Sequence, residues 1–166
     1  AELIKSRWIR PEDVGAYESI GIDCLKLVER FRGTESLIRI VEAYEQRRYP
    51  GNLAELLTLP QEGAYMKPNL DILDQGHLME RETLEEVLAV LREPFTDKLY
   101  IDNVKLGGFL EKFKETDCQY RDCDVCGYCE AVASRVISMD DDWRKEMIAR
   151  FDRAHEMMIT EGMAGP

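Results

Sequence analysis

Four of the five cysteines in this 166-residue chain fall within one short run, and that run constrains the structure more than any other feature. Cys118, Cys123, Cys126 and Cys129 have the spacing C-x4-C-x2-C-x2-C. Structural zinc sites usually take two separated C-x2-C pairs, because a tetrahedral ion is approached from opposite sides, whereas the corners of an iron–sulfur cube accept closely spaced thiolates. The spacing therefore predicts a metal centre and favours a 4Fe-4S cluster, with zinc as the alternative and redox-active thiols as a third interpretation.

Cysteine usage also indicates the compartment. An odd number of cysteines, four of them crowded together, does not resemble a secreted framework of paired disulfides. The sequence contains no apolar run of about eighteen residues, and residues 1–10 mix charged with apolar side chains instead of forming a signal segment. We therefore expect a soluble cytoplasmic protein with no membrane segment.

The charge balance bears on the choice of partners. The chain has 22 Lys and Arg against 33 Asp and Glu, a net charge of −11. Such a chain repels a phosphate backbone unless basic residues gather locally. Direct nucleic-acid binding by this chain is therefore disfavoured.

The first 60 residues have the pattern of a helix–strand–helix unit. Pro11 and the acidic residues after it suit the first turn of a helix, and the branched run Ile22–Val28 predicts a strand. Thr34 is placed to cap a second helix, which ends before Pro50. The apolar stripe of that helix consists of Leu37, Ile38, Val41, Ala43 and Tyr44.

One such unit cannot bury both faces of its strand, because parallel strands need neighbouring strands and covering helices. The predicted fold class is therefore α/β, a partial β/α-barrel unit followed by a mainly helical tail. The missing strands would come from an amino-terminal barrel or from another protein chain.

The rest of the chain is predicted to divide into two parts. Residues 61–97 combine an extended connection with one helix, whose start is marked by the capping pair Thr83 and Glu86 and whose end is marked by Pro94. Residues 98–166 form the Cys-rich metal-binding tail, with a short strand at Leu99–Ile101 and two helices after the cysteines. Asp140–Asp142 can cap the last helix.

A second candidate site lies where the predicted strand meets the following helix. Lys26, Arg30 and Arg32 precede Thr34 at a helix start, where free N–H groups favour an anion such as a carboxylate or phosphate. The alternative is that neighbouring glutamates neutralise these cations at the surface. Cys24 is expected to be buried in the core, and neither His77 nor His155 has the setting of a metal ligand.

Several stretches resemble the later part of the U32 peptidase-like family. They are Trp8-Ile-Arg-Pro-Glu-Asp13, the segment from Gly21 to Arg30, the segment from Ala43 to Asn52, and Tyr100-Ile-Asp-Asn103 with the Gly108-Phe-Leu110 that follows it. Glu29 stands where the family pattern has a glycine. In those family members that act as hydroxylases, the cysteines that hold the cluster lie in the barrel and not in a tail.

The resemblance implies a barrel of β/α units and a set of activities. Several members are implicated in oxygen-independent hydroxylation of RNA bases or of a quinone precursor, and some carry iron–sulfur clusters. Lys26 and Arg30 would then lie at the active-site end of a late barrel strand, where a small anionic substrate such as the dicarboxylate prephenate would fit.

The function expected from the sequence is that of an iron–sulfur fragment or subunit of a U32-like enzyme. It would support oxygen-independent hydroxylation or related redox chemistry together with a partner chain. Two alternatives stay open: a zinc-stabilised protein-interaction module without catalysis, and a peptidase-related subunit.

Overall fold

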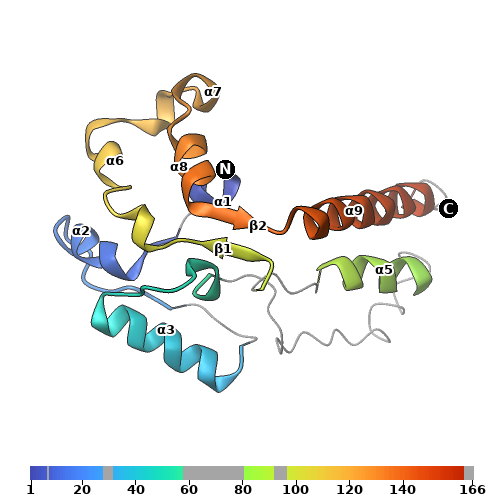
Figure 1. Ribbon diagram of the computed structural model, residues 1–166, viewed down its shortest axis with the longest axis horizontal. Helices are drawn as coiled ribbons and strands as arrows, with labels where there is room; N and C mark the ends of the chain where they lie inside the picture. Colours follow the sequence, from blue (N-terminus) through green and yellow to red (C-terminus); the bar gives the residue numbers. More distant parts are fainter. Residues whose placement is uncertain (7, 28–31, 58–80, 92–96, 163–166) are drawn as a thin grey trace.

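In the part of the chain that the structure describes, helices surround a short two-stranded sheet (Figure 1). The computed structural model describes residues 1–6, 8–27, 32–57, 81–91 and 97–162. Strand β1 (Leu99–Ile101) pairs antiparallel with β2 (Ile137–Met139), and the register places Ile101 opposite Ile137. The ladder continues at both ends, because Asp102 N–H donates to the carbonyl of Val136 at 2.8 Å and Asp140 N–H donates to that of Lys98 at 3.0 Å.

The helices follow in chain order along the described segments. The α-helices are α1 (Glu2–Lys5), α2 (Val14–Glu18), α3 (Thr34–Gln46), α5 (Arg81–Leu91), α6 (Glu111–Glu115), α7 (Cys123–Cys126), α8 (Tyr128–Val136) and α9 (Asp141–Gly162). Short 3-10 turns are η1 (Pro11–Asp13), η2 (Leu53–Glu55), η3 (Val104–Leu106) and η4 (Cys118–Tyr120). Within these segments no helix is both long and apolar enough to cross a membrane.

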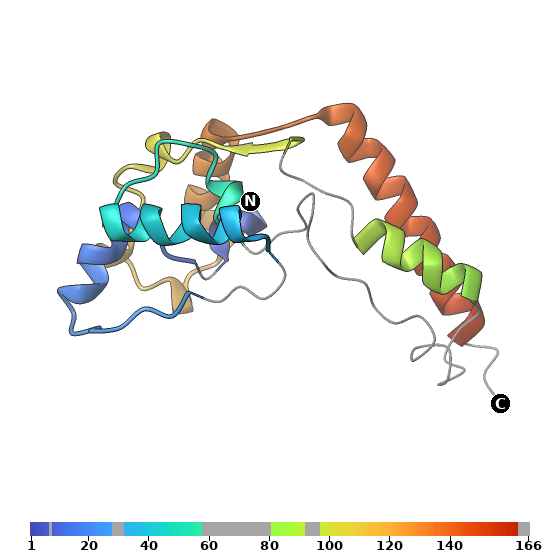
Figure 2. The same ribbon diagram turned by 90° about the horizontal axis from the view of Figure 1, so that it is seen from below.

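The core lies where α1, α3, η2, η3, α8 and the sheet meet. Its fully buried members include Leu53, Ile101 and Leu106, and Ile40 and Val136 pack into the same cluster. Removing such side chains from water is the main favourable term in folding. Helices α5 and α9 instead pack against each other and extend beside this body (Figures 1 and 2).

Two buried asparagines tie distant segments to the sheet. Asn52 donates to the carbonyl of Leu99 at 2.8 Å and accepts from the N–H groups of Ile101 at 2.8 Å and Ala54 at 3.1 Å. Asn103 donates to the carbonyl of Tyr49 at 2.6 Å. Buried polar groups need such partners, so these side chains specify how the segments meet.

A charged pair completes this polar network. Arg10 is 3% exposed, and it donates to both carboxylate oxygens of Asp13, at 2.6 and 2.7 Å, and to the carbonyl of Asn103 at 2.9 Å. The Asn103 amide also donates to the Glu12 carboxylate at 2.9 Å. Arg10, Glu12, Asn52 and Asn103 come from three of the stretches singled out in the sequence, residues 8–13, 43–52 and 100–103, and these hydrogen bonds bring the three together.

Several sequence predictions are confirmed locally. The strand at Leu99–Ile101 and the helix between Gly33 and Pro50 are present, but Thr34 does not cap that helix, because the N-cap is Gly33 and no side chain bonds to the helix start. Asp140 caps α9 by accepting from the N–H groups of Asp142 and Trp143. The capping pair at Thr83 is wrong, because α5 already begins at Arg81 and Thr83 lies inside its first turn.

The predicted strand over 22–28 is not seen in the described residues. Residues 22–27 carry no regular secondary structure, and position 28 lies outside the described residues. Cys24 is exposed and not buried as predicted, because no strand places it against a core. The β/α barrel stays a prediction.

Candidate metal centre

Two aspartates shape the backbone around the first two cysteines of the run. Asp117 accepts from the N–H of Gln119 at 3.0 Å, and Asp122 accepts from the N–H of Asp124 at 2.9 Å. Each carboxylate thereby caps a short helix. Cys118 and Cys123 are consequently the first residues of η4 and α7.

Gly127 connects the third cysteine to the fourth. Its φ of 62° is left-handed, which an L side chain adopts at a cost, and it ends α7 and begins α8 at once. Its N–H donates to the carbonyl of Cys123 at 2.9 Å, and its own carbonyl accepts from Ala131 at 3.0 Å. The turn therefore sets Cys126 and Cys129 on the adjoining ends of two helices.

All four cysteines line one cavity of about 50 Å³. Cys118 and Cys123 are exposed, whereas Cys126 and Cys129 are half-buried. The volume is several times the roughly 10–15 Å³ that admits one water molecule. The cavity lies in the cysteine lobe, which we define as residues 109–136 and which stands uppermost in Figure 1.

The thiols are close enough to influence one another. Burial raises the pKa of Cys129, and negative charge on Cys118, Cys123 and Cys126 raises it further, while Lys5 opposes the increase. Thiolates held together in this way repel one another, and a bound cation would remove that repulsion.

The cysteines fit a metal in donor type and in sharing a cavity. Thiolates are the preferred ligands of both iron–sulfur clusters and structural zinc. Among the described residues, however, no three Cys, His, Asp or Glu side chains converge closely enough to hold an ion as they stand. Metal binding would therefore require the loop to close further around its occupant.

An aromatic cluster joins this lobe to the core. The ring of Phe109 stacks on Tyr128 with centroids 5.7 Å apart and meets Phe113 edge-on at 5.0 Å. The Tyr128 hydroxyl also donates to the carbonyl of Phe109 at 3.1 Å. Phe113 and Tyr128 line the cysteine cavity, so its inner wall is fixed to the body of the protein.

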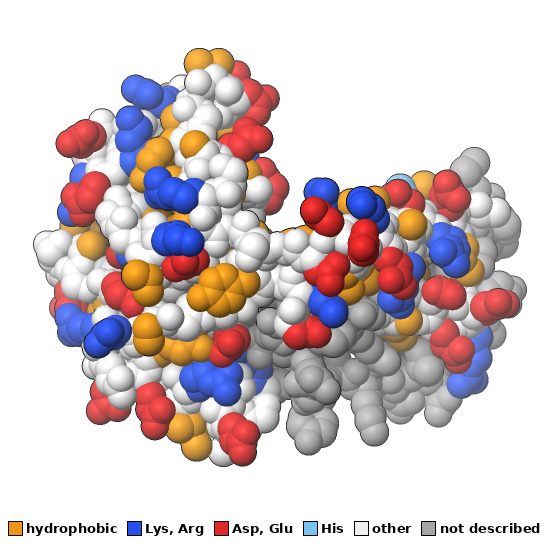
Figure 3. Space-filling view, viewed as in Figure 1, with side chains coloured by type: hydrophobic (Ala, Val, Ile, Leu, Met, Phe, Trp, Pro, Cys, Tyr) orange, Lys and Arg blue, Asp and Glu red, His pale blue; other side chains and the backbone are white. Residues whose placement is uncertain are grey.

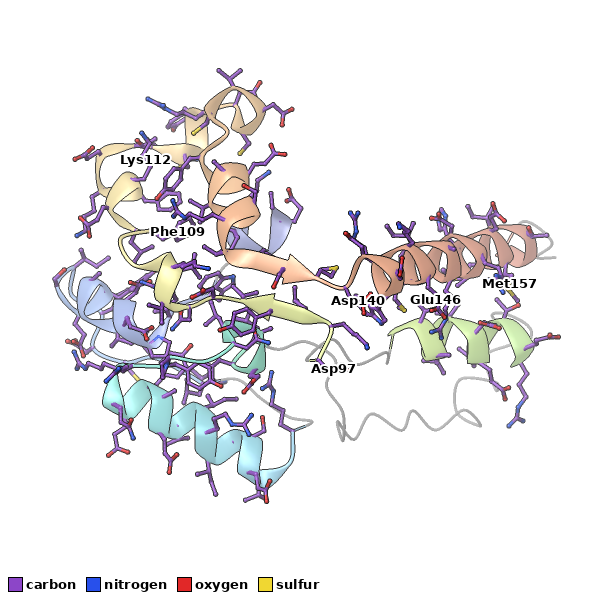
Figure 4. The ribbon with its side chains drawn as sticks, in the orientation of Figure 1. Asp97, Phe109, Lys112, Asp140, Glu146 and Met157 are labelled. Carbon is purple, nitrogen blue, oxygen red and sulfur yellow. The ribbon has the colours of Figure 1, made fainter. Side chains whose placement is uncertain are left out.

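Three cations also line the cavity: Lys5 from α1, Lys112 from α6, and Arg121 from the loop before α7. Phe109 and Lys112, both labelled in Figure 4, belong to this lobe, and Figure 3 shows a column of Lys and Arg side chains up its front. Sequence reasoning missed all three of these cations. Lys5 arrives only because α1 packs on α8, a contact for which the sequence contains no local signal.

The predicted anion site is not brought together in the described residues. Arg32 donates to the carbonyls of Glu55 and Leu57, which fixes the end of the η2 segment. Lys26 is exposed, Thr34 is the exposed first residue of α3, and Arg30 lies outside the described residues. The anion site stays a prediction, and Arg32 has a structural role beside it.

Comparison with known proteins gives one distant relative. The chain is 27% identical over 137 residues to a protein of Methanocaldococcus jannaschii named as an uncharacterized protease, and the match covers 82% of this chain. The chain spans about 30% of the length of that relative. No family model matches the chain, and no solved structure matches it significantly.

These findings define the chain as a distant relative of one part of a larger protein that carries a protease name. The fold adds a small sheet with helices around it and a lobe in which four cysteines share a cavity.

Proposed function

We propose that this chain is the metal-bearing part of a U32-like protein, with Cys118, Cys123, Cys126 and Cys129 holding a 4Fe-4S cluster. The observation that carries the proposal is that all four thiols line one cavity. A single crowded run of thiolates suits the corners of a cube, and the half-buried pair gives the cluster a partly dry inner side.

The residues of this chain would divide the work. The thiols bind, the caps at Asp117 and Asp122 and the turn at Gly127 orient them, and the rings of Phe113 and Tyr128 limit water on the inner side. A cluster of this kind supplies one-electron transfer when bound.

The wider activity that we propose is oxygen-independent hydroxylation or related redox chemistry, shared with another protein chain or with an amino-terminal barrel. An exposed apolar arc on α3 supports such a neighbour, since Leu37, Ile38 and Val41 are 39%, 51% and 52% exposed on one side of that helix. A small anionic substrate would bind near Lys26 and Arg30.

Anaerobic purification followed by iron and sulfide analysis tests the cluster. We expect about four iron and four sulfide per chain and a brown colour. Substitution Cys126→Ser should lower the iron content, whereas Cys24→Ser should leave it unchanged, because Cys24 is exposed and lies outside the run. Protein without iron or sulfide would contradict the proposal.

The second candidate is a zinc-stabilised interaction module. It is favoured by two apolar side chains at the outer surface of the lobe, Tyr120 at 82% and Val125 at 85% exposure. About one zinc per colourless chain would select this function. Substitution of Val125 by Asp should then weaken binding of a partner without loss of zinc.

A peptidase-related subunit is the third possibility, and it is supported by the name of the relative. Hydrolysis of an unfolded protein substrate by the metal-loaded chain would favour it. Loss of that hydrolysis in the Cys126→Ser variant would connect it to the cysteine lobe.

A further inference from the structure

Two lysines in α6 differ in their surroundings although they are two residues apart. Lys114 donates to both oxygens of Glu111, at 2.8 and 3.0 Å. Lys112 is half-buried, lines the cysteine cavity, and forms no ion pair with any carboxylate in the described part of the chain. Arg121 also lines the cavity without an ion pair to the residues that the structure describes.

A cation in this position is stabilised by a counter-charge. A half-buried lysine keeps less hydration than an exposed one, and negative charge near it stabilises its ammonium. The lining includes two carboxylates, Asp124 and Glu130, but neither approaches Lys112 or Arg121 within ion-pair distance. The four thiols are the remaining groups of the cavity that can carry negative charge.

A bound metal centre would supply that negative charge, because its cysteine ligands are thiolates. Each thiolate brings one negative charge, so four of them outweigh a divalent ion or the core of an oxidised cluster. Lys5 also acts on the thiols, but its ammonium already has a carboxylate partner in Glu2 at 2.8 Å. Lys112 and Arg121 are therefore the cations with the most to gain from a filled site.

We propose that Lys112 and Arg121 are positioning residues that balance the negative charge of the metal centre and raise both its metal affinity and its reduction potential. The inference rests on the proposed metal site. Nearby positive charge stabilises the more negative, reduced state of a cluster.

The test uses the full chain and four variants. Lys112→Gln and Arg121→Gln remove the charges, Lys112→Arg retains one, and Lys114→Gln is the matched control from the same helix. Metal and sulfide contents are measured first, and an anaerobic redox titration follows. We expect a more negative potential for Lys112→Gln and Arg121→Gln, and a wild-type potential for Lys112→Arg and Lys114→Gln.

Metal affinity gives a second readout that also applies to zinc. In competition with a chelator, Lys112→Gln should bind about 10-fold more weakly, as is usual when a residue supporting a metal site is changed. Lys114→Gln should bind as the wild type does. Arg121 is exposed, so Arg121→Gln keeps the test valid should Lys112→Gln fold poorly.

The two proposals fail in different ways. A wild-type chain without stoichiometric metal overturns the metal centre and this inference with it. A wild-type chain that holds metal, with Lys112→Gln and Arg121→Gln matching Lys114→Gln in potential and affinity, overturns the inference and leaves the metal centre intact.

Discussion

Replacement of the buried side chain of Asn52 by Ala should strongly destabilise the protein. Asn52 is 6% exposed, and with partners in the described part of the chain it makes one hydrogen bond donated to Leu99 and two accepted from Ala54 and Ile101. Each buried neutral hydrogen bond contributes about 1 kcal/mol net, so their loss costs about 3 kcal/mol. That is a large part of the roughly 5–15 kcal/mol by which domains are stable.

The assay is urea unfolding followed by far-UV circular dichroism, with the midpoint and the slope fitted together. Ser134→Ala is the control, since Ser134 is exposed and its hydroxyl donates to a carbonyl of its own helix at 3.0 Å. We expect the control to change the free energy of unfolding by less than about 0.5 kcal/mol. A loss below about 1 kcal/mol for Asn52→Ala would show that the network does not stabilise the fold as argued.

Four further substitutions test other parts of the structure, all by the same urea assay. Gly127→Ala should destabilise the protein by about 1 kcal/mol because of the positive φ at this position, and without a steric cost because nothing lies within 4 Å of the added Cβ. Gly15→Ala, in a helix, should instead stabilise the protein by about 0.5–1 kcal/mol. Changes of the same sign in the free energy of unfolding would refute this reasoning. Arg10→Met should cost about 3 kcal/mol by leaving Asp13 unpaired, and a loss under about 1 kcal/mol would contradict a buried pair. Burial, and then the 2.6 Å hydrogen bond to Glu55, raise the pKa of Tyr49, so on raising the pH the unfolded chain loses this proton before the folded chain does. The contribution of Tyr49 to stability is therefore complete below about pH 10 and decreases above it. Tyr49→Phe should make the free energy of unfolding fall less steeply at alkaline pH.

Local signals in the sequence predicted local structure well. The short apolar run Leu99–Ile101 and the aspartate at 140 act within a few residues, and the structure has the strand and the cap. The apolar stripe of α3 was only half informative. Of the predicted stripe, Ala43 is buried and Tyr44 is half-buried, whereas Leu37, Ile38 and Val41 are exposed. Ile40, which the stripe did not include, is buried. A helical period identifies an apolar side, but it does not say how much of that side is covered.

Contacts between distant segments were beyond sequence reasoning. Asn52 binds backbone groups almost fifty positions along the chain, and no spacing rule announces such a partner. The same limit applied to Arg32, which resembled an anion ligand beside a helix start but donates to two backbone carbonyls. In a sequence, a lysine or arginine is recognised only by its charge. The folded structure decides whether backbone carbonyls, and not a bound anion, accept its hydrogen bonds.

The cysteine site combines both situations. The four thiols were predictable because the cysteines are close in sequence, and they do share a cavity. The cations around them were not, because Lys5 reaches the site from the other end of the chain. Sequence spacing therefore identified the donors, and only the structure identified the groups that would tune them.

Helix α8 connects the polar network to the candidate metal centre. Its first turn contains Cys129 and follows Gly127, and its last residue, Val136, runs directly into β2. Asp102 holds that end through the carbonyl of Val136, while Asn52 holds β1 against the same sheet. One end of α8 is thus fixed by the sheet, and the other depends on the cysteine run. Metal binding should accordingly add its stability at the Gly127 end, where few core residues lie, and should leave the sheet end nearly unchanged.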